Sequence, residues 1–98
     1  VKKVTKEVAF VRSGGRRVQI DVDALGVDEE RKFAVLAEAN WGAADPGEIL
    51  PKLRAAAEAL LPEGWRVRYV IFARSFTRRA EEADLIDVGR LLELLSRL

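Results

Sequence analysis

The first quarter of the chain alternates in the way that a β-hairpin does. Residues Val4 to Val11 are mostly apolar and predict a strand. Ser13-Gly14-Gly15 follows and indicates a tight turn, because glycine reaches positive φ without steric cost. Arg17 to Leu25 predicts the second strand, whose alternation places on one face Val18, Ile20, Val22 and Ala24. Its other face carries Gln19, Asp21 and Asp23.

A third apolar segment follows a charged turn at Asp28-Glu29-Glu30. Residues Lys32 to Ala39 are apolar at successive positions, so this segment predicts a central strand that is buried on both faces. We expect Asn40 to Asp45 to form a loop.

The clearest helix start in the chain follows that loop. Asp45 suits the N-cap, Pro46 the first helical position and Glu48 the capping-box position. Apolar residues then recur at helical spacing, and Pro62 and Gly64 are expected to end the helix.

The last third of the chain returns to the strand pattern. Trp65 to Ala73 alternates as a strand, Arg74 to Glu82 predicts a polar, basic loop, and Leu85-Ile86 is long enough for a short strand. Asp87 can cap a final helix that runs to the end of the chain. The apolar face of that helix would consist of Leu91, Leu94, Leu95 and Leu98.

The predicted order is therefore β-β-β-α-β-(β)-α within a single domain, residues 1–98. An antiparallel hairpin leads into a central strand, and the helix should cross over to a parallel strand of the same sheet. Helices packed on a mixed sheet of four to five strands give an α/β or α+β layered fold.

The composition of the chain limits the kinds of catalytic and metal sites that it can form. The chain has no cysteine and no histidine, so thiolate sites, serine–histidine hydrolysis and the commonest zinc ligands are excluded. A bound metal would need oxygen ligands, which favours Mg²⁺, Ca²⁺ or Mn²⁺. The 17 basic and 16 acidic residues nearly cancel, so nucleic-acid binding would depend on local clustering of charge. No apolar run is long enough to cross a bilayer, and we expect a cytoplasmic protein without membrane contact.

Two acidic residues suggest a metal site. Asp21 lies on the polar face of the second strand, and Glu38 lies near the end of an otherwise apolar third strand. If the two strands pair, the carboxylates repel each other unless a cation binds both. Asp23 shares a face with Asp21 and is a second possible ligand, although we favour Asp21. Alternatively, Glu38 lies at a solvated strand end or pairs with an arginine.

These segments resemble a known family. Gln19-Ile20-Asp21-Val22, followed by Glu38-Ala39-Asn40-Trp41, is similar to the D…(D/E)-x-K core of the PD-(D/E)XK, or restriction-endonuclease-like, superfamily. The chain is most similar to the nuclease-like domain at the C-terminus of archaeal ATPases, and its stretch Phe72 to Thr77 also resembles that domain. The resemblance covers roughly residues 16 to 95 and implies a restriction-endonuclease-like fold.

The resemblance implies that Asp21 and Glu38 bind Mg²⁺, for which Mn²⁺ can substitute, and that Asn40 occupies the position of the catalytic lysine. Asparagine is neutral and can neither carry the positive charge of lysine nor accept a proton. Loss of one such electrostatic partner typically costs about 100- to 1,000-fold in rate. Lys52 could supply the charge from the following helix, or it could lie on a solvated helix face.

The basic residues suggest a surface for DNA. Arg74, Phe76, Arg78 and Arg79 lie in the loop after the fourth strand, where they could follow a phosphate backbone and stack on a base. Alternatively, these arginines pair with the acidic residues that follow them.

Three functions are consistent with these features. The first is a Mg²⁺-dependent DNA endonuclease, or a degenerate nuclease-like domain. The second is a non-catalytic module that binds nucleic acid or protein. The third is a structural homodimer, because a small domain with an incomplete core often dimerises.

Overall fold

A computed structural model describes residues 3–97, without the side chains of Lys3 and Leu94. It shows an α+β fold, a five-stranded mixed sheet with two helices. The expected contributions of Leu94 and Leu98 to the last helix lie outside what the structure describes. The strands lie in the sheet in chain order. The elements are β1 (Lys3–Ser13), β2 (Arg16–Asp28), β3 (Phe33–Ala44), α1 (Pro46–Leu60), β4 (Arg66–Phe76), β5 (Asp84–Ile86) and α2 (Val88–Leu95).

The predicted hairpin is confirmed. β1 and β2 pair antiparallel along almost their whole length, from Ser13 opposite Arg16 to Lys3 opposite Val27. The turn between them consists of Gly14 and Gly15, with φ of 58° and 77°. Two consecutive residues at positive φ match the right-handed twist of the strands, and glycine adopts this conformation without strain.

A β-bulge interrupts the alternation of β2. Thr5 lies opposite Leu25 but Glu7 lies opposite Val22, so β2 has one more residue than β1 in this interval. As a result, the buried face continues through Leu25 and not through Ala24, which corrects the predicted face of Ala24.

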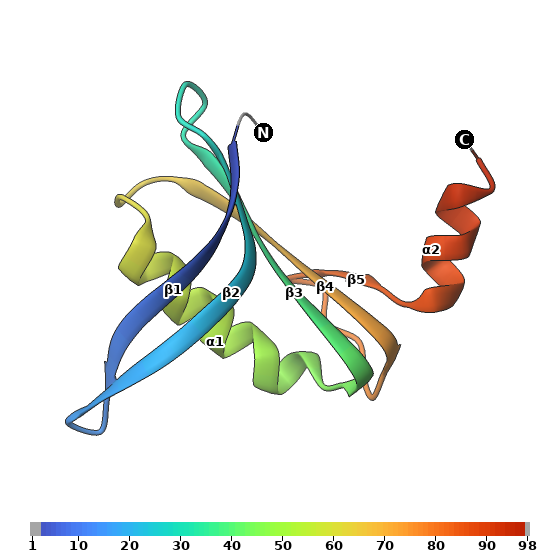
Figure 1. Cartoon of the computed structure of the whole chain (residues 1–98), viewed down its shortest axis with the longest axis horizontal. Helices are drawn as coiled ribbons and strands as arrows, with labels where there is room; N and C mark the ends of the chain where they lie inside the picture. The colour runs from blue at the N-terminus through green and yellow to red at the C-terminus, as the bar shows by residue number, and fades with distance from the viewer. Residues whose placement is uncertain (1–2, 98) are drawn as a thin grey trace.

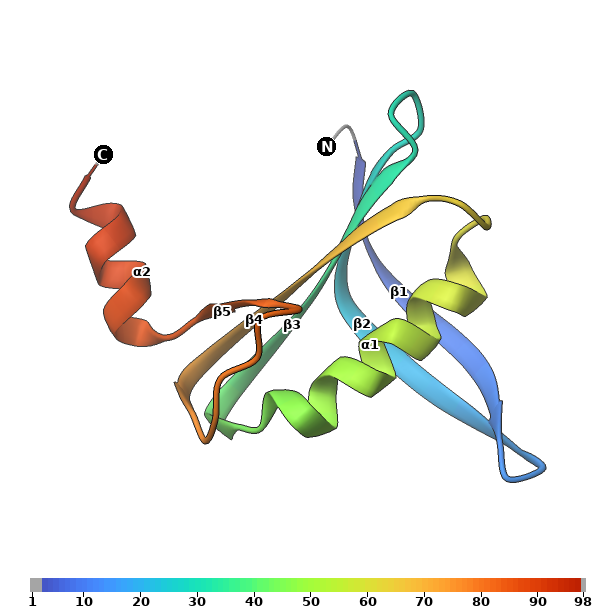
Figure 2. The same ribbon diagram turned by 180° about the vertical axis from the view of Figure 1, so that it is seen from behind.

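The sheet divides beyond a short ladder between β2 and β3. These strands pair only from Asp28 opposite Phe33 to Ala24 opposite Ala37. Figure 1 shows the consequence: beyond this ladder the β1–β2 hairpin and the β3–β4 pair diverge as the two arms of a fork, and Figure 2 shows the same division from behind. Helix α1 contacts strands of both arms and so bridges them on one face of the sheet.

Strand β3 is longer than predicted. The segment Asn40 to Asp45, expected to be a loop, continues β3 as far as Ala44. It pairs parallel with β4 up to Ala44 opposite Phe76, with an irregularity between Asn40 and Ala43. The parallel β3–α1–β4 crossover agrees with the prediction. The segment lacks the alternation and the β-branched residues of a strand, and its pairing with β4 extends β3 through it.

The start of α1 is as predicted. The Asp45 side chain accepts a hydrogen bond from the Gly47 backbone N–H at 2.9 Å, and Pro46 occupies the start of the helix. The helix buries Leu50, Leu53 and other apolar residues against the sheet. The largest fully buried side chains of the core are Leu36, Leu53, Ile71, Val22 and Pro46.

The face of the sheet opposite α1, which we call the open face, is only partly covered. Phe33, Val35 and Ala37 of β3 point to it and are half-buried. The expectation that β3 is buried on both faces was therefore wrong for the described part of the chain. Helix α2 contacts only β4 and β5 among the described elements and projects beyond the end of the sheet.

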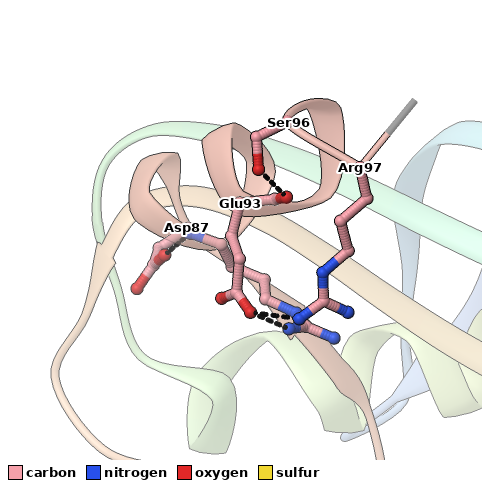
Figure 3. A network of polar contacts seen from close by, with 5 residues as sticks. Asp87, Glu93, Ser96 and Arg97 are labelled. Carbon is pink, nitrogen blue, oxygen red and sulfur yellow. Dashed lines mark hydrogen bonds and ion pairs between the residues drawn. The ribbon is translucent and has the colours of Figure 1, made fainter.

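Helix α2 is stabilised largely by contacts within itself. As predicted, the Asp87 carboxylate caps it and accepts the Arg90 backbone N–H at 2.7 Å. The Glu93 carboxylate lies 2.8 Å from the Arg97 guanidinium and 3.4 Å from that of Arg90, and the Ser96 hydroxyl donates to the Glu93 carbonyl (Figure 3). Several of its apolar side chains remain exposed: Val88, Leu91, Leu92 and Leu95. No helix within residues 3–97 has the length and apolar character needed to span a membrane.

The turn geometry makes a testable prediction. Replacing Gly15 by alanine forces a side chain into the left-handed region and should destabilise the domain by about 1–2 kcal/mol. Urea unfolding followed by circular dichroism would measure this change. Gly42→Ala is the matched control, because a Cβ there meets only the Asn40 side chain at 3.6 Å and the backbone has no positive φ. Equal stability of the two variants would contradict the turn assignment.

Candidate functional site

The structure separates Asp21 from Glu38. Asp21 lies opposite Val8 in the hairpin, beyond the ladder between β2 and β3. It alternates with Ile20 and with the fully buried Val22, so its side chain points to the open face. The Gln19 side-chain amide donates to its carboxylate at 3.0 Å. The expected convergence of the Asp21 and Glu38 side chains is therefore not found.

Glu38 points to the face that α1 covers. It alternates with the buried residues Ala34 and Leu36 and lies beside the buried Ile71 of β4. It is the first residue of β3 beyond the ladder with β2, so its side chain lies where the two arms of the fork separate. Glu38 borders a groove of about 850 Å³ between the β1–β2 hairpin and α1. Asp21 also borders this groove, although alternation directs its side chain to the other face.

The surroundings of Glu38 perturb its protonation. Partial burial raises the pKa of the Glu38 carboxyl above its usual value, the negative charge of Asp23 raises it further, and the positive charge of Lys52 partly offsets both. Asp23, and not the favoured Asp21, is therefore the carboxylate that interacts with Glu38. Lys52 reaches this position from α1, as the sequence allowed.

Asp23 also links β2 to β3 where the two strands begin to diverge. Its carboxylate accepts a hydrogen bond from the Ala39 backbone N–H at 2.8 Å. Strand β2 offers no backbone acceptor here because the ladder ends at Ala24 opposite Ala37. The side chain thus satisfies a donor that the divergence of the strands leaves without a partner. One carboxylate oxygen of Asp23 is engaged in this way, and the other has no hydrogen bond among the described residues.

The Asn40 side chain bonds within its own strand. Its side-chain oxygen accepts the Gly42 backbone N–H at 2.9 Å, within the irregular part of β3. No group of three or more acidic side chains that could hold a metal occurs within residues 3–97. Glu38, Asp23 and Lys52 are the charged residues that the structure brings together around the predicted site.

The residues expected in the basic loop are divided between a strand and a loop. β4 continues to Phe76, so Arg74 and Phe76 belong to the strand and the expected start of the loop at Arg74 was wrong. Phe76, expected to stack on a base, is half-buried and packs against the core. The Arg78 guanidinium lies 3.0 Å from the Asp45 carboxylate that caps α1. Arg79 is exposed, and Arg74 points to the open face because it alternates with the buried Ala73.

The structure also reveals aromatic residues that the sequence did not single out as a surface. Phe10, Trp41 and Phe72 are 50%, 93% and 38% exposed. Phe10 and Phe72 point to the open face, because their neighbours Ala9 and Ile71 are buried on the other face. The Arg17 guanidinium lies 4.2 Å from the centre of the Phe10 ring. The sequence does contain a signal for this surface, because aromatic residues share one face of β1 and of β4 with polar residues. That signal becomes informative only once the structure shows that α1 packs on the opposite face.

Comparison with known proteins adds no identification: no protein-family model, curated protein or solved structure matches the chain. The resemblance to PD-(D/E)XK nucleases therefore stays a prediction.

The raised pKa of Glu38 predicts a pH-dependent stability. The folded chain holds the Glu38 proton more tightly than the unfolded chain does, so ionisation of this group disfavours folding. The penalty is absent below the unfolded pKa and is complete once the pH has risen through the folded pKa. Glu38→Gln should therefore raise the melting temperature at pH 7 by roughly 2–4 °C, equivalent to about 0.5 kcal/mol for a domain of this size after allowance for solvent screening.

Thermal unfolding at pH 7 and pH 4 would test this expectation, with Glu58→Gln, at an exposed position of α1, as control. The difference between Glu38→Gln and the original chain should shrink at pH 4. A variant that is less stable than the original chain at pH 7 would show that the Glu38 charge is stabilising.

Proposed function

We propose that this chain is a nucleic-acid-binding domain with a reduced restriction-endonuclease-like fold. The observation that carries the proposal is the charge of the open face. By strand alternation, this face bears six basic residues: Lys6, Arg12, Arg17, Arg66, Arg68 and Arg74. The acidic residues on it are fewer: Asp21, Asp28, which interacts with Arg31 in its own turn, and Asp84, which pairs with Arg68. Asp23, in the bulge at the edge of this face, accepts the Ala39 backbone N–H.

The basic residues of this face are suited to phosphate contacts. Arg12 and Arg74 form no ion pair among the described residues, so their charge is not compensated within the domain. A net +1 chain does not attract a polyanion strongly as a whole. A face with a local excess of arginine does, because each phosphate contact releases a counterion. The β-β-β-α-β order, which the superfamily core shares, agrees with a nuclease-like ancestry.

Binding should be measured by fluorescence anisotropy with a labelled duplex and a labelled single strand, each about 20 nucleotides long, which exceeds the span of one small domain. We expect affinity for at least one of them to fall steeply between about 50 and 200 mM salt. Arg12→Ala and Arg74→Ala should each weaken binding and reduce the salt slope by about one. Arg54→Ala, an exposed arginine on α1, is the matched control and should have no effect. Absence of binding, or binding that neither open-face variant weakens, would refute the proposal.

A second candidate function is supported by the Glu38 cluster. A carboxylate with a raised pKa, a second carboxylate and a lysine lie together at the fork, beside a groove. Glu38 and the second carboxylate oxygen of Asp23 could hold Mg²⁺ or Mn²⁺, and Lys52 could stabilise charge on a phosphate, which are the requirements of metal-assisted hydrolysis. This arrangement would use Asp23 in place of Asp21.

If this site binds metal, millimolar Mg²⁺ or Mn²⁺ should raise the melting temperature of the original chain, because a ligand of the folded state stabilises it. Glu38→Gln and Asp23→Asn should abolish the increase. We expect Asp23→Asn to preserve the fold, because the side-chain amide of the introduced asparagine keeps an oxygen that can accept the Ala39 N–H. Asp21→Asn is the control. Loss of the increase in Asp21→Asn and Glu38→Gln, but not in Asp23→Asn, would restore the original pairing of Asp21 with Glu38. No increase with either ion would refute the metal site.

A further inference from the structure

The open face contains a hollow at one end. It has a volume of about 490 Å³ and lies between the ends of β3 and β4 and the start of α2. Its lining is mainly apolar and includes Ala39, Trp41, Phe72, Ile86, Val88 and Leu91. Three polar residues also line it: Asn40, Arg74 and Asp87. The Asp87 carboxylate is engaged in the cap of α2, where it accepts the Arg90 backbone N–H. The volume of the hollow lies within the range of small-molecule sites, which is large enough to hold a nucleobase.

Trp41 is the residue that most needs an explanation. It lies in the irregular part of β3, it is 93% exposed, and within residues 3–97 nothing covers it. An indole that packs on nothing contributes little to the fold, whereas an exposed aromatic beside an apolar hollow is a typical stacking partner for a base.

The charge of the whole open face distinguishes between possible occupants, because Arg74 and Asp87 balance within the hollow itself. An apolar lining alone suits a base or the apolar side chains of a partner protein. The basic excess of the open face favours a polyanion, and it disfavours a second copy of this chain placed face to face, because the same positive charges would then oppose one another. In a duplex the bases are stacked on each other and their faces are not accessible, so stacking on Trp41 requires an unpaired base.

We propose that the hollow binds a base of single-stranded nucleic acid, with Trp41 and Phe72 stacking on the ring and Arg74 contacting the adjoining phosphate. This inference rests on the proposed function and adds to it the strand form and the position of contact. Phe10, Arg12 and Arg17 on the other arm of the fork offer a second aromatic and basic position for the same strand.

The test compares two oligonucleotides of equal length and charge. One is an oligothymidylate, and the other is an abasic sugar–phosphate strand. We expect the full chain to bind the oligothymidylate at least about tenfold more tightly, because only that strand can stack. Trp41→Ala should remove most of this difference and leave the abasic strand unaffected, whereas Trp41→Phe should retain much of it. Arg74→Ala should weaken binding of both strands.

The outcomes separate this inference from the proposed function. Equal binding of the two strands, or an oligothymidylate affinity that Trp41→Ala leaves unchanged, overturns base stacking while nucleic-acid binding stands. Absence of binding to both strands and to the duplex overturns both. Light scattering completes the test: a dimer that Trp41→Ala dissociates would assign the hollow to a second copy of the chain and overturn the inference.

Discussion

The arrangement of this domain depends on the short ladder between β2 and β3. Five residues of each strand pair, from Asp28 opposite Phe33 to Ala24 opposite Ala37, and this ladder is the backbone connection between the two arms of the sheet. Beyond it the strands diverge, and α1 fills the inner side of the fork with apolar side chains. The groove bordered by Glu38, the hydrogen bond of Asp23 and the separation of Asp21 from Glu38 all follow from the point at which the ladder ends.

The bulge in β2 lies next to the end of this ladder and determines where the Asp21 and Asp23 side chains point. An additional residue between Val22 and Leu25 shifts the side-chain alternation by one position. In a regular strand, Asp21 would point to the same face of the sheet as Glu38. Because of the bulge, it points to the opposite face. Asp23, within the bulge, is released from the strand pattern and bonds to the Ala39 N–H.

The two faces of the sheet have different chemistry. On the α1 side, Glu38 lies at the fork with Asp23 and Lys52, and partial burial together with the charge of Asp23 favours its protonated form. The open face combines exposed aromatic rings with arginines, two of which lie over rings: Arg17 over Phe10 and Arg66 over Phe33. Because the two surfaces lie on opposite faces, substitutions on one should leave the function of the other intact, and the two proposed functions can be tested separately.

Local patterns in the sequence determined most of the elements: the glycine turn at Gly14 and Gly15, the cap at Asp45 and the cap at Asp87 each depend on residues close together in the chain. The parallel pairing of β4 with β3 followed from the general rule for crossover connections. Only the tertiary structure decided which carboxylates meet and which face stays open. Those features depend on the register between β2 and β3 and on one bulge, and a shift of a single residue in register reverses the direction of every side chain that follows it.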